Sequence, residues 1–331
     1  MEVIGLKTKM IVFLLFLLFS PTKTFADYIV QSQDPYHYNQ LVEDLAKLTD
    51  RYRNVLEIRE IGKSEFGKTI WAVKLGKGEE NIVLVGTHHA REWISTNLLM
   101  VMLERYAETY QTGEMFGEFD PAILDDVAIW FVPMLNPDGV DIQQGELPPQ
   151  YKRKLILMNK GSMDFTRWKA NGLGLDLNRQ YPAGWDELPT EDGPSFKGYK
   201  GKQPIEGKEV QAFIQFVKDI NPKSAIAYHS AGHVIYWQYG DRQNIFRDYF
   251  LASSLAKLTG YRLDTPSIDA TGGGFTDWFI EEYGRPAFTL ELTDHEGESH
   301  PPMEKFHEEW IRNQFVGFYL ASEMAIIKSN E

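Results

Sequence analysis

The sequence has 331 residues, a net charge of −13 and no cysteine. Such an excess of acidic groups repels phosphate backbones, which argues against nucleic acid as a partner. A chain of this length can bury enough apolar surface to fold without disulfides, so the lack of cysteine does not argue against export. No Ser/Gly tract, proline-rich spacer, charge block or internal repeat marks a linker, which predicts one domain.

Residues 1–26 have the pattern of a secretory signal peptide. Lys7 and Lys9 precede an apolar run, residues 10–19, that is too short to span a bilayer as a stable helix. Thr24 and Ala26 have the spacing that a signal peptidase reads, which predicts cleavage after Ala26. The alternative is an N-terminal anchor, but no cysteine is available for a lipid and no longer apolar stretch follows. We therefore expect a secreted protein whose residues 27–331 form one domain, without a stable membrane anchor after cleavage.

The apolar pattern then predicts helices alternating with strands along the chain. Residues 81–85 and 127–132 are continuous apolar runs, which suit strands buried on both faces. Ser95 or Thr96 is expected to cap the second helix, and Asn136 to Gly139 is expected to form a turn. The predicted helices cover residues 36–52, 95–106, 209–220, 246–258, 275–283 and 303–327. The predicted strands cover residues 55–61, 69–75, 81–85, 127–132, 224–228 and 287–292.

This alternation predicts an α/β fold: a single domain with a mixed, mostly parallel twisted sheet and helices on both faces. In open sheets of this kind, ligands bind at the carboxyl ends of the strands. The residues that follow the predicted strands are therefore the first candidates for a functional site.

Polar residues with metal-binding or acid–base chemistry stand at three of these strand ends. A histidine and a glutamate three residues apart, across a strand-to-helix corner, can face one point, and the helix start stabilises the glutamate. Two neutral imidazoles and a carboxylate, with one position left for water, describe a catalytic zinc site. The residues concerned are His88, His89, Glu92, His229 and Glu291.

Each of these residues also has an ordinary structural explanation. His89 and Glu92 alone could mark a solvated helix start with a capping glutamate, and His229 could be a hydrogen-bonded core histidine. Glu291 is harder to explain in this way, because an ionised carboxylate inside an apolar strand is costly unless something pairs with it. Their occurrence together in one parallel-sheet pattern favours the zinc site.

The spacing selects His89 rather than His88 as the candidate ligand. The residue three positions after His88 is Arg91, which cannot bind a cation. Strand alternation also turns His88 away from the side that His89 faces. We therefore expect His88 to have a structural role.

A second pair, His229 and His233, has the four-residue spacing of a helical zinc motif. No glutamate follows His229 directly. Gly232 and the preceding strand argue against a helix at this place, so this pair is the weaker candidate.

Six segments then occur in a characteristic order, and with them the sequence resembles the zinc carboxypeptidase family of the carboxypeptidase A type, from about residue 36 to residue 310. The order and number of these segments make the resemblance specific. The segments are THHAREW (87–93), LNPDG (135–139), LDLNRQYPAGW (175–185), AYHSAG (227–232), GGGFTDW (272–278) and FTLELTD (288–294).

The resemblance implies an enzyme with one Zn²⁺ per chain, bound by His89, Glu92 and His229. It implies that Glu291 acts as general base and then as general acid in peptide hydrolysis. Arg91 would polarise the scissile carbonyl.

The resemblance also implies that Asn178 and Arg179 bind the free carboxylate of the substrate. Three positions depart from the family pattern. Lys169 stands where family members have an arginine that stabilises the oxyanion, and lysine lacks its planar fork. The family's flexible tyrosine aligns with Asp269 or its neighbours, and Thr276 stands at the pocket position that is apolar or aspartate in digestive enzymes.

These departures disfavour a digestive specificity for large apolar or basic residues. Segments 167–185 and 285–297 are most similar to bacterial γ-D-glutamyl-L-diamino acid peptidases, which cut peptidoglycan stem peptides between γ-D-glutamate and diaminopimelate. Thr276 and Asp269 could serve a polar pocket for the diamino acid, or could serve only loop capping and turn formation.

We therefore expect a secreted, cell-wall-directed peptidase that works as a monomer on stem peptides. The alternative is a secreted metallocarboxypeptidase that trims ordinary peptides. A catalytically inactive binding module is disfavoured, because the three implied zinc ligands and Glu291 are all present.

Overall fold

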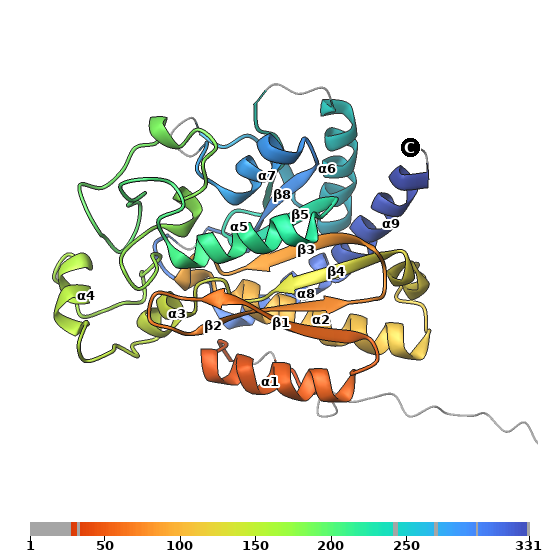
Figure 1. Cartoon of the computed structure of the whole chain (residues 1–331), viewed down its shortest axis with the longest axis horizontal. Helices are drawn as coiled ribbons and strands as arrows, with labels where there is room; N and C mark the ends of the chain where they lie inside the picture. The colour runs from red at the N-terminus through yellow and green to blue at the C-terminus, as the bar shows by residue number, and fades with distance from the viewer. Residues whose placement is uncertain (1–27, 32–33, 241–243, 268–270, 296, 330–331) are drawn as a thin grey trace, which may run out of the picture.

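The computed structural model describes residues 28–31, 34–240, 244–267, 271–295 and 297–329. The expected signal segment and Asp269 lie outside these described residues. The described residues form a mixed α/β fold around one eight-stranded sheet, with the strand order β1-β2-β4-β3-β5-β8-β6-β7 (Figure 1). This architecture confirms the predicted fold class.

The central part of the sheet is parallel: β3 pairs with β4 and β5, and β5 pairs with β8, all in the same direction. Both outer parts include antiparallel pairs, which β2 makes with β1 and β4, and β6 makes with β8. The strands are β1 (Leu56–Lys63), β2 (Thr69–Leu75), β3 (Glu80–Gly86), β4 (Val127–Val132), β5 (Ser224–Ser230), β6 (Val234–Tyr236), β7 (Arg262–Asp264) and β8 (Ala287–Leu292).

Helices cover both faces of this sheet, and two apolar cores result. Ile82 and Leu84 of β3 face a core shared with α1, α2, α6 and α9, whereas Val83 and Val85 face a core shared with α5 and α7. Figure 1 shows α5 in front of the sheet and α2 behind it. Burial on both faces explains why β3 is a continuous apolar run. The helices are α1 (Tyr38–Arg51), α2 (Ile94–Thr112), α3 (Pro137–Gln143), α4 (Lys152–Met158), α5 (Lys208–Ile220), α6 (Ile245–Thr259), α7 (Phe275–Tyr283), α8 (Phe306–Asn313) and α9 (Val316–Ser329).

Two predictions about helix starts were wrong. The segment expected as a turn at Asn136 begins α3, with Pro137 in its first turn and the Asn136 side chain accepting from the Gly139 N–H at 3.0 Å. Asparagine and proline favour helix starts as well as turns, so composition alone could not separate the two. Helix α2 begins at Ile94, and the Ser95 hydroxyl donates to the Glu92 carbonyl oxygen instead of capping the helix.

The predicted closing helix over residues 303–327 is interrupted. A short 3₁₀ turn (Met303–Lys305) precedes α8, and α9 follows after a break. At this break the buried Tyr106 hydroxyl donates to the Gln314 carbonyl oxygen at 2.7 Å and accepts from the Gly317 N–H at 3.2 Å. These bonds replace helical ones and come from a distant part of the chain, so the local pattern did not reveal them.

Three short elements, β6, β7 and α4, were not predicted. The two strands have three residues each, too few for a period to be recognised. Among the described residues, none of the helices combines the length and apolar character needed to span a membrane.

Candidate active site

Three buried side chains meet at the carboxyl ends of the central parallel strands. His89 and Glu92 come from the corner between β3 and α2, where Ala90–Glu92 forms a 3₁₀ turn, and His229 lies near the end of β5. The β5–β8 register places His229 directly beside Glu291. Residues far apart in sequence therefore gather because parallel strands end at the same edge of the sheet.

The corner itself is held by a hydrogen-bond network below His89. Thr87 has a φ of 53°, a left-handed conformation that β-branched residues rarely adopt. Its N–H donates to the Ser95 hydroxyl at 2.8 Å, and its own hydroxyl lies 2.8 Å from that of Thr96. The Asn136 side chain donates to the His88 carbonyl oxygen at 3.0 Å. The hydroxyls expected to cap α2 instead stabilise the backbone that carries His89.

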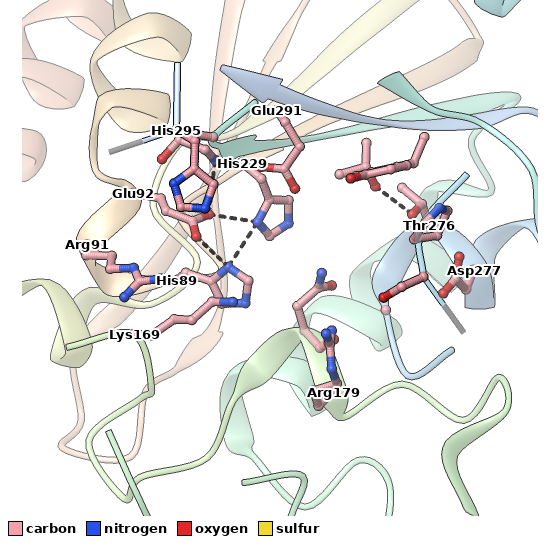
Figure 2. A pocket seen from close by; sticks show the side chains of 18 residues that line it. His89, Arg91, Glu92, Lys169, Arg179, His229, Thr276, Asp277, Glu291 and His295 are labelled. Atoms are coloured by element: carbon pink, nitrogen blue, oxygen red, sulfur yellow. Dashed lines mark hydrogen bonds and ion pairs between the residues drawn. The ribbon is translucent and has the colours of Figure 1, made fainter. Parts of the chain in front are cut away.

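The donor atoms of this group converge on one point (Figure 2). His89 Nδ1 lies 2.9 Å from Glu92 Oε1, and His229 Nδ1 lies 2.8 Å from Glu92 Oε2. The two Nδ1 atoms are 3.0 Å apart. One donor atom from each residue lies within 4.8 Å of the other two. These are the three residues that the sequence analysis selected as ligands.

The chemistry of these donors fits a zinc ion. Asp176 Oδ1 lies 3.0 Å from Nε2 of His89, so only the Nδ1 atom of this ring faces the other two residues. A carboxylate in this place fixes the tautomer and orientation of a metal-binding histidine. Two imidazole nitrogens and one carboxylate, all buried, form the donor set of a catalytic zinc site.

The pKa shifts favour the protonation states that metal binding requires. Burial lowers the pKa of His229, which favours the neutral imidazole. Burial alone would raise the pKa of Glu92, but His89 and His229 hold it well below its ordinary value. A neutral imidazole beside a carboxylate is ready to bind a cation without first losing a proton.

The two histidines that the sequence analysis rejected as zinc ligands, His88 and His233, have other partners. His88 Nε2 lies 3.0 Å from the Tyr181 hydroxyl, and burial holds the pKa of His88 well below its ordinary value. His233 Nε2 lies 2.8 Å from Glu309 Oε1 of α8. Since β5 extends to Ser230, the pair His229 and His233 does not lie on a helix.

A cavity of about 440 Å³ opens beside the three donors. Glu291 lines it, and burial, reinforced by the charge of Glu92, raises the pKa of the Glu291 carboxyl. This carboxyl therefore holds a proton more readily than one in water. The cavity contains all the sequence-selected site residues that the structure describes: His89, Arg91, Glu92, Lys169, Asn178, Arg179, His229, Thr276 and Glu291.

Local contacts orient the side chains opposite the three donors. Arg179 ends a 3₁₀ turn and donates from Nη1 to the Asn178 carbonyl oxygen at 2.8 Å. Asn178 Oδ1 accepts from the N–H of Phe275, the first residue of α7, at 3.0 Å. Thr276 and Thr289 bring their hydroxyls within 2.8 Å of each other. This side of the cavity is therefore polar and rigidly tied to α7.

Sequence reasoning missed Asp176, Asp277, Tyr236 and His295. Asp176 is only 2 % exposed and stands between Leu175 and Leu177. A carboxylate between two apolar residues was the sequence feature that could have identified it. The other three line the cavity: Asp277 lies in the first turn of α7, Tyr236 ends the unpredicted β6, and His295 lies in the loop after β8. Only the folded chain brings them near the donors.

Comparisons with known proteins agree with this geometry. The sequence pattern of the family described as Zinc carboxypeptidase matches residues 41–316. Gamma-D-glutamyl-L-diamino acid endopeptidase 1 of Lysinibacillus sphaericus is 32% identical over 301 residues, which cover 88% of this chain and 73% of that relative. Metallocarboxypeptidase A of Arthroderma otae is 30% identical over 283 residues, which cover 78% of this chain and 64% of that relative.

Solved structures share the same architecture. Bovine thrombin-activatable fibrinolysis inhibitor, solved in complex with tick carboxypeptidase inhibitor, matches with a TM-score of 0.72 at 21% identity. The match covers 89% of this chain and 98% of that one. At this identity the likeness concerns the fold alone.

Proposed function

The chain belongs to the zinc carboxypeptidase family and is a zinc-dependent peptide hydrolase, and we propose that it cuts peptidoglycan stem peptides between γ-D-glutamate and a diamino acid. The observation that carries this substrate is the match to a γ-D-glutamyl-L-diamino acid endopeptidase over 88% of the chain. The charged and hydroxyl groups that line the cavity also support this substrate, because both γ-D-glutamate and the diamino acid are polar.

We assign the zinc ion to His89, Glu92 and His229. When bound there, the ion supplies Lewis acidity toward a water molecule and the scissile carbonyl. Glu291 then takes the proton of the attacking water and passes it to the leaving amine. Its raised pKa suits this task, because the carboxyl must hold the proton between the two transfers.

On the amine side of the bond, Arg179 and Asn178 would bind a carboxylate of the diamino acid. The guanidinium fork matches the two oxygens of a carboxylate. The hydroxyls of Thr276 and Thr289 and the carboxylate of Asp277 line the same cavity and could bind the second amino-acid head of diaminopimelate. The suggested part of Asp269 in this pocket stays a prediction.

The second candidate is a carboxypeptidase that trims ordinary peptides, and the match to a metallocarboxypeptidase A supports it. The hydroxyl pair at Thr276 and Thr289 disfavours a large apolar side chain in the pocket.

We also propose that the protein is secreted, associates with the cell wall and acts as a monomer. The signal-peptide pattern of residues 1–26 supports secretion.

Incubation of the zinc-loaded protein with L-Ala-γ-D-Glu-diaminopimelate, and separately with a blocked dipeptide that ends in an apolar residue, tests this function. We expect the protein to release diaminopimelate, which mass spectrometry detects, and to cleave little of the dipeptide. Glu291→Gln should lower the rate by about 10²-fold or more, because the amide cannot accept the proton. Cleavage of the dipeptide alone would contradict the proposed substrate, and full activity of Glu291→Gln would contradict the mechanism.

A further inference from the structure

Three cationic side chains line the cavity, and only one of them, Arg179, is assigned to the carboxylate of the diamino acid. Arg91, Lys169 and Arg179 are half-buried and line it. Within the ranges that the structure describes, none of the three forms an ion pair with a carboxylate. The charges of Lys169 and Arg179 act on the nearby carboxylates of Asp176 and Glu291, but no carboxylate that the structure describes pairs with either cation directly. Their remaining N–H donors therefore favour a ligand that brings its own negative charge.

The three cations form two separate groups. Arg179 is tied to α7 through its neighbour Asn178, which accepts from the Phe275 N–H. Arg91 lies in the 3₁₀ turn between His89 and Glu92, and the Lys169 carbonyl oxygen accepts from the Ala90 N–H of the same turn at 3.1 Å. Figure 2 shows Arg91 and Lys169 beside His89, across the cavity from Thr276 and Asp277. Arg91 and Lys169 therefore lie on the His89 side of the cavity, apart from the residues that Asn178 and Arg179 join to α7.

The cavity also continues past Arg91. A second hollow of about 70 Å³ shares Arg91, Ser230, Ala231 and His295 with the main cavity. Arg91 is anchored here, because its Nη1 donates to the carbonyl oxygens of Glu298 at 3.0 Å and Arg167 at 3.3 Å. A guanidinium has five N–H donors, and its other nitrogens are not used in these two bonds. Figure 2 shows Arg91 and His295, which line this hollow, across the cavity from Thr276 and Asp277, so the acyl part of a substrate would occupy the hollow if the diamino acid lies beside Thr276.

The chemistry of a γ-glutamyl bond matches this arrangement. An amide formed through the γ-carboxyl leaves the α-carboxylate free, so the acyl residue carries a negative charge next to the scissile bond. In an ordinary α-linked residue the α-carboxyl forms the peptide bond and carries no charge. We propose that Lys169 and Arg91 bind this free α-carboxylate, so that the enzyme selects substrates with a carboxylate on each side of the scissile bond. The inference rests on the proposed function and adds the feature by which the acyl residue is recognised.

A matched pair of substrates tests this recognition. One is L-Ala-γ-D-Glu-diaminopimelate, and the other carries a carboxamide in place of the α-carboxylate, with the same shape and no charge. For the zinc-loaded full chain we expect kcat/KM to favour the free acid by about tenfold or more, as for a lost hydrogen bond to a charged group. Lys169→Met should bring this ratio close to one, and Lys169→Arg should retain it.

Lys257→Met is the matched control, because Lys257 is exposed on α6, and this variant should leave both rates unchanged. Equal kcat/KM for the two substrates would overturn the inference and leave the proposed function intact. A Lys169→Met variant that loses the same factor on both substrates would also overturn it, because lysine would then act on the reaction and not on selection. Failure to cleave either substrate, with cleavage of ordinary peptides, would overturn the proposed function itself.

Discussion

Asp176 shows how one buried side chain determines what its neighbour can bind. Its Oδ1 lies 3.0 Å from His89 Nε2, and its Oδ2 accepts from the Gly198 N–H at 3.2 Å. Burial alone would raise its pKa, but Lys169 and His89 hold the pKa of Asp176 well below its ordinary value. The charged carboxylate therefore holds the His89 ring with Nδ1 toward the proposed zinc position.

Asp176→Asn should weaken zinc binding by about 10- to 100-fold, because an amide orients the His89 ring less firmly and removes the charge behind it. Competition with a chromophoric chelator measures this affinity directly. Asp192→Asn, at an exposed aspartate, is the control. An unchanged zinc affinity in Asp176→Asn would show that the His89 orientation does not depend on this contact.

At the scale of elements, one side chain of α2 determines where the C-terminal helical segment breaks. Tyr106 is fully buried, and its hydroxyl bonds to backbone groups on both sides of the break between α8 and α9. Gly317 belongs to this contact, since a Cβ there would lie only 2.7 Å from Cε2 of the Tyr106 ring. The break thus depends on close approach between α2 and the start of α9.

Tyr106→Phe should lower the free energy of unfolding by about 1–3 kcal/mol, because a buried carbonyl and a buried N–H lose their partner. Urea unfolding followed by circular dichroism measures the change. Tyr249→Phe, at a tyrosine that is 53% exposed, should change stability little. Equal urea midpoints for the two variants would contradict this expectation, because the hydrogen bonds lost by Tyr106→Phe would then have been replaced by water or by a shift of the helix.

At the scale of the whole molecule, the buried carboxyl of Glu209, which does not line the cavity, links stability to pH. Glu209 of α5 accepts from the Glu65 N–H at 3.2 Å and from the Asn171 side chain at 3.0 Å, so it joins three distant segments. Burial, together with Asp138 and Glu65, raises the pKa of Glu209 to about 8. The folded state thus binds this proton more tightly than the unfolded state, and its stabilising effect is present below the ordinary pKa and lost as pH rises through about 8.

Glu209→Gln should therefore gain stability relative to the natural protein as the pH rises from about 5 to about 9. The amide has one acceptor oxygen, so it can accept from the Glu65 N–H or from the Asn171 side chain but not from both. This constant cost is present at both pH values and cancels in the comparison. Urea unfolding of the zinc-loaded proteins at each pH gives the difference, with Glu114→Gln at an exposed site as control. A difference that does not change with pH would contradict a raised pKa.

The sequence by itself determined the fold class and the set of candidate metal ligands. Periodicity revealed the long strands and helices, because a strand buried on both faces or a helix with one buried face leaves a local pattern. The spacing of His89 and Glu92, with His229 and Glu291 at other strand ends, then pointed to zinc, because parallel strands bring such ends together.

Only the tertiary structure decided the features that depend on contacts between distant segments. It supplied the contact between His89 and Asp176, the break held by Tyr106, and the cationic side chains around the cavity. The Asn136 segment shows the same limit on a smaller scale, since a turn and a helix start use the same residues. Hydrogen bonds and charges across the fold leave no period in the chain, so they become visible only when the segments are packed together.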